Sequence, residues 1–353
     1  MKYFNHYDNL KFYKDPIAFN KYTNKDVLKY AIGANMYMPA IKEGIFEKLI
    51  DNKFREIGAI TLCCEDAIPE EKVSDAEINI LDILNKLYER NIKEENLMDR
   101  LPLIFVRVRN VEQFKNLAKQ MEAKHLKMLT GFNFPKFNSV NGANYFEILD
   151  NLSTKYNETL YGMPILEDKR ILYQETRIQE LREIQIILDD YSKYVLNIRV
   201  GGTDFSSIFG LRRSVHNTIW DIRSISNCLI DILNAFLRED KKYVISGPVW
   251  EYFSWDENSD EIKGLKKELE LDIQNGFQGK TIIHPSQIDT VNKSYIVDYY
   301  EYQDAVNILH SNGGVFKSEE GNRMNEVNPH RNWAKKIIAK AEIFGVYDKN
   351  AKL

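Results

Sequence analysis

Short apolar runs alternate with longer amphipathic segments along most of this 353-residue chain. Segments with apolar residues at helical spacing, such as EINILDILNKLYERN at 77–91, lie between runs rich in β-branched and aromatic residues, which are typical of strands. We place eight such runs at residues 34–40, 58–64, 103–108, 128–135, 161–167, 194–200, 243–249 and 280–285. This alternation predicts a parallel sheet, because successive parallel strands need helical crossovers.

Eight strands are the number that closes a (β/α)8 barrel, so the fold class we predict is an α/β TIM barrel. The runs are apolar on both faces, as strands covered from inside and outside should be. We assign residues 31–296 to the barrel, 1–30 to an N-terminal extension and 297–353 to a C-terminal extension that forms a lid or an oligomerisation element. Within the latter, the Gly-, Ser- and Asn-rich segment 311–327 indicates a loop or hairpin before a last helix.

Composition excludes several classes of protein. A net charge of −4 gives no basic excess to neutralise phosphates, so we expect no nucleic-acid partner. No apolar run approaches about 20 residues, and the first residues lack the apolar core of a signal peptide. We therefore expect no membrane association and a cytoplasmic location. The adjacent Cys63 and Cys64 would point to opposite faces of a strand, so we interpret them, with Cys228, as small apolar filler rather than as a metal or redox pair.

In a barrel of this type, the chemistry lies where the carboxyl ends of the strands meet. Most of the predicted strands end beside a polar or ionisable side chain, and the set comprises Glu65, Asp66, Arg107, Arg109, Lys136, Glu167, Asp168, Asp204, Ser246 and His284. Any one of them alone is more commonly an ordinary loop residue, so the joint set is what indicates a site. We expect His284 to pack under the site and Arg109 to lie in the solvated loop.

Glu167 and Asp204 follow successive strands, whose backbones would lie about 5 Å apart, so both carboxylates could reach one ion. Carboxylates without a neighbouring His or Cys favour a hard cation, Mg²⁺ or Mn²⁺, which keeps water and substrate oxygens as further ligands. The alternative is that both acids form salt bridges with Arg107 or Lys136. A guanidinium at position 107 would hold a substrate carboxylate by paired hydrogen bonds.

The segment IRVGGTDFSSIFGLRR places two glycines before Asp204, where the backbone can approach a ligand closely. We therefore include Gly202 and Thr203 among the substrate-binding residues. The spacing is neither GxGxxG nor a P-loop, so it predicts no nucleotide site. For Arg212 and Arg213 two interpretations remain: they contact a phosphate, or they cap a helix.

Several segments together resemble one family, in order along residues 33–293: TLCCEDAIPEEK, FVRVRN, FNFPKFNS, PILEDKR, RVGGTDFSSIFGLRR and, most specifically, GFQGKTIIHPSQIDTVN. The family is that of the citrate lyase beta subunit and the HpcH/HpaI aldolases, with malyl-CoA and citramalyl-CoA lyases as relatives. The tail is similar to that of a divergent branch of TIM-barrel carbon–carbon bond lyases, which we associate with tellurium-resistance and stress-response operons.

The resemblance implies a Mg²⁺-dependent lyase or aldolase that cleaves or forms a 2-hydroxy acid, or its acyl thioester, through a metal-stabilised enolate. It makes Glu167 and Asp204 the metal ligands and Arg107 the carboxylate anchor. It assigns Glu65 and Asp66 to acid–base chemistry or to its support.

No Schiff base is required by this chemistry, so we interpret Lys136 as an electrostatic partner in the catalytic set. The family also implies a homo-oligomer, most commonly a trimer. In many relatives a lid from a neighbouring subunit supplies an aspartate, and in this chain the nearest acid in the corresponding stretch is Glu326. The sequence leaves open whether the substrate is carried by coenzyme A, by an acyl carrier protein or by neither.

Two alternatives to the lyase remain at this point. One is another enzyme on the same barrel, either a hydrolase of short acyl thioesters or a phosphate-ligand enzyme that uses Arg212 and Arg213. The other is a non-catalytic binding subunit of an operon-encoded complex, since fold does not fix function.

Overall fold

The computed structural model describes residues 1–51, 56–241 and 243–350, and its central feature is an eight-stranded parallel sheet in the order β8-β7-β6-β5-β4-β3-β2-β9. The strands are β2 Ala34–Pro39, β3 Ala59–Cys63, β4 Leu103–Arg107, β5 Gly131–Phe134, β6 Tyr161–Leu166, β7 Ile198–Val200, β8 Ile245–Ser246 and β9 Lys280–Ile282. A parallel bridge between Gly247 and Lys280 joins the two ends of the sheet. The sheet therefore closes on itself, and the predicted α/β TIM barrel is confirmed.

Each predicted run contains one barrel strand, although the last three strands are shorter than the runs. Strand β8 stops at Ser246, immediately before Gly247 and Pro248, and a proline has no N–H to donate to a neighbouring strand. Strand β7 begins only at Ile198, although an isolated bridge from Val195 to Gly162 continues its pairing with β6. The run at 128–135 was predicted too long at its start, because Met128 ends helix α5.

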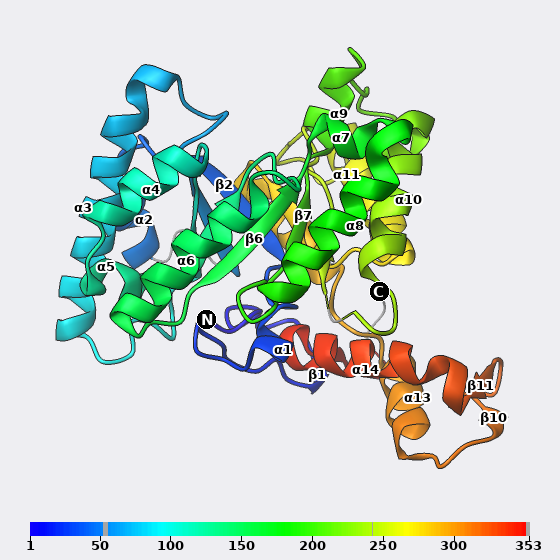
Figure 1. Cartoon of the computed structure of the whole chain (residues 1–353). Coiled ribbons are helices and arrows are strands. Elements are labelled where there is room, and N and C mark those ends of the chain that lie inside the picture. The colour runs from blue at the N-terminus through cyan, green and yellow to red at the C-terminus, as the bar shows by residue number, and fades with distance from the viewer. Residues whose placement is uncertain (52–55, 242, 351–353) are drawn as a thin grey trace.

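Helices cover the outside of the barrel (Figure 1). They are α2 Ile45–Ile50, α3 Val73–Lys93, α4 Val111–Gln120, α5 Ala123–Met128, α6 Gly142–Tyr156, α7 Lys169–Leu172, α8 Gln174–Asp190, α9 Gly202–Ile208, α10 Arg223–Phe236, α11 Asp260–Asn275 and α12 Ile288–Lys293. Residues 171–188 carry apolar side chains at helical spacing, which predicts one helix, but the helix is broken at Tyr173, whose backbone is extended. Arg177 stabilises this break, because its guanidinium donates to the carbonyl oxygens of Ile171 and Leu172 at the end of α7.

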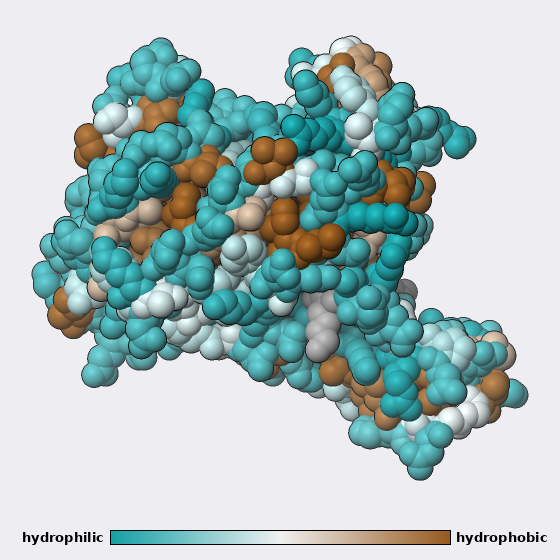
Figure 2. All heavy atoms as spheres, viewed as in Figure 1, coloured by the Kyte–Doolittle hydropathy of each residue, from teal (hydrophilic) through white to brown (hydrophobic). Residues whose placement is uncertain are grey.

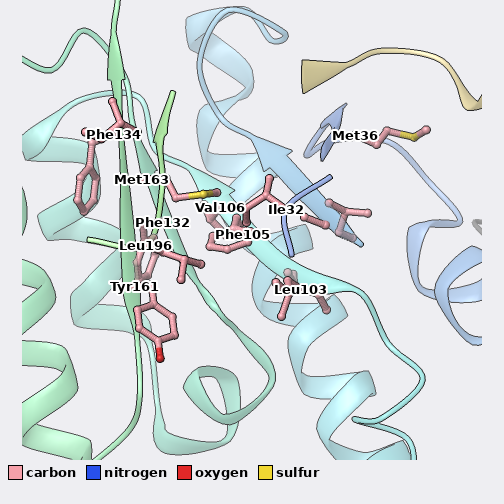
Figure 3. Packing of buried hydrophobic residues seen from close by; sticks show 14 of the residues in the cluster. Ile32, Met36, Leu103, Phe105, Val106, Phe132, Phe134, Tyr161, Met163 and Leu196 are labelled. Atoms are coloured by element: carbon pink, nitrogen blue, oxygen red, sulfur yellow. The ribbon is translucent and has the colours of Figure 1, made fainter. Parts of the chain in front are cut away.

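The layer between strands and helices is packed with large apolar side chains (Figure 3). Phe132 and Phe134 on β5 meet Phe114 on α4 and Tyr145 on α6, and the rings of Phe134 and Tyr145 stack with centroids 4.7 Å apart. Fully burying an aromatic or aliphatic side chain contributes roughly 1.5–3 kcal/mol, so this layer supplies much of the stability of the barrel.

The inside of the barrel is more polar than the sequence predicted. Thr61 on β3 donates a hydrogen bond of 3.0 Å to the Oδ1 atom of Asn35 on β2. Asn133 on β5 donates to the Thr61 hydroxyl at 3.1 Å and to the Tyr37 hydroxyl at 2.8 Å. These residues alternate with apolar ones that face the helices, so the strands are not apolar on both faces. A chain of hydrogen-bonding groups thus leads through the barrel toward the ends of its strands.

The two terminal extensions pack together at the end of the barrel where the strands begin (Figure 1). Tyr3 donates a hydrogen bond of 2.9 Å to the carbonyl oxygen of Ala31, before β2, and its ring stacks on Phe344 at 4.6 Å. Strand β1, Phe12–Lys14, pairs antiparallel with β12, Val346–Tyr347. The extensions therefore close the barrel end that is opposite to the predicted site.

The remaining elements of the extensions are α1 Lys25–Leu28, α13 Tyr299–His310, β10 Val315–Lys317, β11 Met324–Glu326 and α14 Val327–Phe344. Strands β10 and β11 form the hairpin predicted at 311–327. Helix α13 and this hairpin project from the barrel as an arm, at the lower right of Figure 2. Residues 351–353 of the predicted extension lie outside the described residues. A lid function for this segment stays a prediction.

A buried ionic network fastens α11 to the barrel. Lys280 on β9 is fully buried, and its Nζ atom lies 2.9 Å from Glu268 and 2.6 Å from Asp272, both on α11 and both fully buried. Arg213 lies 2.7 Å from the second oxygen of Glu268, and the indole N–H of Trp220 donates to Asp272 at 2.8 Å. Arg213, for which the sequence left open a phosphate contact, therefore belongs to a structural ion pair.

We expect Lys280→Met to lower the free energy of unfolding by about 3–5 kcal/mol, because it leaves the buried Asp272 without a cation and Glu268 with Arg213 alone. Lys86→Met is the matched control, since Lys86 and its partner Asp82 are each 48% exposed and such a pair contributes about 0–1 kcal/mol. Urea denaturation followed by circular dichroism measures both changes. Equal stability of the Lys280 variant and the parent would contradict the structural role of this network.

Candidate active site at the mouth of the barrel

A cavity of about 430 Å³ opens at the carboxyl ends of the barrel strands. Its lining includes six residues predicted from the sequence, namely Asp66, Arg107, Glu167, Gly202, Thr203 and Asp204. It also includes Tyr37, Cys63, Arg199 and Thr281, which we did not select. The remaining two predicted residues, Glu65 and Lys136, are bonded directly to this set. Residues that are remote along the chain are therefore brought to one mouth.

Arg107 is the centre of the charged cluster. It is the last residue of β4, and its Nη2 atom lies 2.6 Å from Glu65, 3.1 Å from Asp66 and 3.1 Å from Glu167. The guanidinium is largely buried, and buried charges are stable only when they are paired. These carboxylates come from the ends of β3 and β6, so one cation holds together the ends of three strands.

Lys136 adds a second cation through an unusual backbone. Its φ angle of 47° lies in the left-handed region, which costs about 1 kcal/mol or more for a residue other than glycine. This conformation directs its backbone N–H to Glu167, at 2.9 Å, while its Nζ atom donates to Glu65. The Nζ atom also lies 3.9 Å from Asp204. Lys136 therefore contacts Glu167 through its backbone, and Glu65 and Asp204 through its side chain.

Glu167 and Asp204 are the residues that could hold a metal ion. Oε1 of Glu167 accepts hydrogen bonds from Arg107 and Lys136, whereas no described residue donates one to Oε2. Asp204, in the first turn of α9, is 3.9 Å from Lys136 and lines the same cavity. Within the described ranges, no cluster of three His, Cys, Asp or Glu side chains is suited to a metal. Two carboxylates completed by water and substrate oxygens fit Mg²⁺, which needs no full protein cage.

The carboxylates of the cluster differ in their protonation. The pKa of Glu167 is raised to about 8, chiefly by burial and in part by the charge of Asp204, while Arg107 opposes the rise. Burial also raises the pKa of Glu65. The pKa of Asp66 is lowered although burial opposes it, because Glu65, Arg107 and Lys136 stabilise its charged form. Two adjacent acids with opposite shifts are suited to exchange a proton with a ligand.

The other strand-end residues support the mouth rather than line it. Ser246 donates to Asn197 at 2.8 Å inside the barrel. His284 accepts a hydrogen bond from the Ser286 backbone and stacks on Phe253 at 4.3 Å. Arg109 places its Nη1 atom 3.5 Å from carbonyl oxygens of the loop that follows β3. All three cysteines, each within the described part of the chain, are free and buried, and Cys63 also lines the cavity.

Arg199 was missed because we considered only the ends of the strands. It lies within β7, between Ile198 and Val200, and its side chain reaches the floor of the cavity. A charged residue between two buried apolar residues of a central strand is the signal that could have found it. The alternation of a strand places Arg199 on the same face as Gly201, and hence toward the barrel interior.

The family model described as C–C bond lyase of the TIM-barrel fold matches residues 26–346. The chain belongs to this family. The match includes the whole barrel and most of the C-terminal extension. The sequence pattern of the C–C bond lyase family therefore covers both the projecting arm and the residues at the mouth of the barrel. The predicted association with tellurium-resistance operons stays a prediction.

Solved structures with a similar fold include a citrate lyase and protein CitE. A citrate lyase from Burkholderia xenovorans has a TM-score of 0.66 at 14% identity, covering 89% of this chain and 93% of that chain. Protein CitE from Mycobacterium tuberculosis, in complex with magnesium, acetoacetate and coenzyme A, has a TM-score of 0.55 at 18% identity, covering 89% and 99%. These likenesses support the fold alone. The comparison with curated proteins gave no match.

None of the helices in the described part of this C–C bond lyase family member combines the length and apolarity that a membrane crossing requires.

We expect Gly201→Ala to weaken divalent-ion binding and to lower the melting temperature. A Cβ atom at Gly201 would lie 2.2 Å from Oε2 and 2.5 Å from Cβ of Glu167, so the carboxylate and the adjoining backbone must both move, although the φ angle of −94° at Gly201 suits alanine. Calorimetric titration with Mg²⁺ measures the effect, which should reach about tenfold if one ligand interaction of about 1.4 kcal/mol is lost.

Gly210→Ala provides the control. Its Cβ atom would meet nothing within 4 Å, although its φ angle of 64° makes the substitution cost stability. We expect this variant to melt earlier than the parent and to bind Mg²⁺ equally well. Unchanged Mg²⁺ affinity in Gly201→Ala would argue against Glu167 as a ligand.

Proposed function

We propose that this protein is a Mg²⁺-dependent carbon–carbon lyase or aldolase that cleaves or forms a 2-hydroxy acid or its acyl thioester. Membership of the C–C bond lyase family supports the reaction class. The observation that carries the proposal is the meeting of Glu167 and Asp204, from the ends of successive strands, in one cavity beside Arg107.

Glu167 and Asp204 would hold the ion, each through an oxygen that the protein leaves available. Bound Mg²⁺ would supply Lewis-acid polarisation of the substrate oxygen and offset the negative charge that develops as the bond breaks. Manganese would suit the same oxygen ligands. The four carboxylates Glu65, Asp66, Glu167 and Asp204 outnumber the two cations Arg107 and Lys136 in this cluster, which favours binding of a divalent cation.

The remaining residues orient the substrate and handle protons. Arg107 keeps its buried Nε atom without an acceptor, and this donor would hold the substrate carboxylate. Glu65 and Asp66 would exchange the proton of the substrate hydroxyl, and Lys136 would stabilise whichever of them is ionised. Gly202 and Thr203 would approach the substrate from the first turn of α9, where backbone N–H groups are available.

The proposal extends to a coenzyme A thioester as substrate and to a homo-oligomer, for example a trimer, in which the projecting arm reaches another copy. The CitE complex with magnesium and coenzyme A supports the first of these as a chemical possibility for the fold. We place the reaction in the cytoplasm, where three free cysteines would stay reduced.

We expect Glu167→Gln and Asp204→Asn to abolish metal-dependent turnover and to leave the melting temperature close to that of the parent. Removing one ligand from a site with two protein carboxylates should reduce kcat/KM by at least about 100-fold, by analogy with the loss of a group that stabilises developing charge. Asp168→Asn is the matched control. Asp168 adjoins Glu167 but accepts a hydrogen bond from the Arg170 N–H as a helix cap, and asparagine caps equally well.

A screen of 2-hydroxyacyl thioesters and free 2-hydroxy acids identifies the reaction. Release of a 2-oxo acid or an aldehyde that requires Mg²⁺ supports the lyase. Release of free thiol without a carbonyl product would instead favour a thioester hydrolase, and the absence of any Mg²⁺ or acid binding would favour a non-catalytic subunit. If either ligand variant turned over substrate as fast as the parent, the metal assignment would be wrong.

A further inference from the structure

We propose that Arg199, on the floor of the cavity, binds a carboxylate of the substrate. This inference rests on the proposed function for the nature of the ligand, and on the geometry of Arg199 for the site. Arg199 is only 1% exposed and lines the cavity from within β7.

The guanidinium of Arg199 lacks the partners that a buried charge requires. Its Nη2 atom donates to the Thr281 hydroxyl, whereas its Nε and Nη1 atoms are buried without an acceptor. No carboxylate among the described residues lies within 4.0 Å of it. An arginine stays charged at any ordinary pH, so it cannot relieve this cost by releasing a proton.

The other buried arginines of the described chain are paired. Arg107 contacts three carboxylates, Arg177 lies 2.7 Å from Asp231, and Arg213 lies 2.7 Å from Glu268. Arg199 departs from this pattern, and it is also the one of the four that lies deepest within a barrel strand. If the charge of Arg199 served only the fold, we would expect a protein carboxylate beside it, as there is beside each of the other three arginines. The exception indicates that the missing anion comes with a ligand.

The neighbours of Arg199 hold the guanidinium in place without neutralising it. Its Cζ atom lies 5.7 Å from the centroid of the Tyr37 ring, and the Cζ atom of Arg107 lies 5.9 Å from the same centroid. The face of an aromatic ring attracts a cation by about 1–2 kcal/mol, which is less than a buried charge needs. The ring of Tyr37 thus neighbours both the charged cluster, through Arg107, and the unpaired Arg199.

The net charge of the cavity and its cluster is consistent with a ligand that carries one carboxylate. The cavity and its cluster contain the acids Glu65, Asp66, Glu167 and Asp204 and the cations Arg107, Lys136 and Arg199. With a bound divalent cation, the site would hold one positive charge in excess, taking every acid as ionised. A ligand with a single carboxylate would neutralise it, and Arg199 offers that group two free donors, Nε and Nη1, in addition to the free Nε of Arg107.

The test is calorimetric binding of two small 2-oxo acids, pyruvate and glyoxylate, and of the uncharged pyruvamide, to the full chain with and without Mg²⁺. We expect Arg199→Gln to weaken binding of the acids by at least about tenfold, as loss of a charge-assisted hydrogen bond would. Binding of pyruvamide and of Mg²⁺ alone should not change. Arg199→Lys, which keeps the charge, should restore part of the lost affinity, and Arg212→Gln removes an exposed arginine as the control.

The melting temperature provides an independent readout. If Arg199 serves the ligand, its replacement by glutamine removes a buried unpaired charge and should leave the melting temperature unchanged or higher. A lower melting temperature together with equal weakening of pyruvate and pyruvamide would overturn the proposal in favour of a structural role. Binding of the acids to Arg199→Gln as tightly as to the parent would also overturn it, as would failure of the parent to bind either acid.

The test of Arg199 can succeed or fail independently of the proposed function. Binding of the acids that depends on Arg199 but is indifferent to Mg²⁺, in a protein that binds no Mg²⁺, would support the anchor and reject the metal-dependent lyase. Mg²⁺ binding that depends on Glu167 and Asp204, with acid affinity independent of Arg199, would do the reverse.

Discussion

One guanidinium organises the mouth of this barrel. Arg107 is held by three carboxylates from two other strand ends, and each of those carboxylates is in turn positioned by a further group. Glu167 receives the backbone N–H of Lys136, and Glu65 receives the side chain of the same lysine. Such an arrangement is stable only if the strands are fixed in register, because a shift of one residue would turn every one of these side chains to the other face.

Charge is buried in this molecule for two different purposes. Around Lys280 the acids and cations are matched, and they fasten α11 to the barrel. At the mouth the acids exceed their cations, Lys136 adopts a left-handed backbone, and Arg199 lacks an anion. Incomplete compensation at a cavity is the usual mark of a binding site, because strain and unpaired charge persist where a ligand relieves them.

The fold was largely predictable from local patterns. Eight apolar runs separated by amphipathic segments indicate parallel strands with helical crossovers, and the position of each run was confirmed. Strand lengths were less predictable: β7 is short because its continuous pairing begins only at Ile198, and β8 is short because its pairing ends before Pro248, and both depend on the neighbouring strand. The break at Tyr173 escaped prediction for a similar reason. Arg177 stabilises it from within the following helix, and periodicity alone does not register such a contact.

Of the site, the sequence by itself determined the residue types and the end of the barrel at which they gather, because strand direction fixes which residues follow a strand. That is how Glu65, Asp66, Arg107, Lys136, Glu167 and Asp204 were found. Only the tertiary structure decided which charges are paired, that Arg213 belongs to the network around α11, and that Arg199 does not belong to any network. The physical reason is that pairing is a matter of distances of a few ångströms between segments remote along the chain, and closure of the barrel sets those distances.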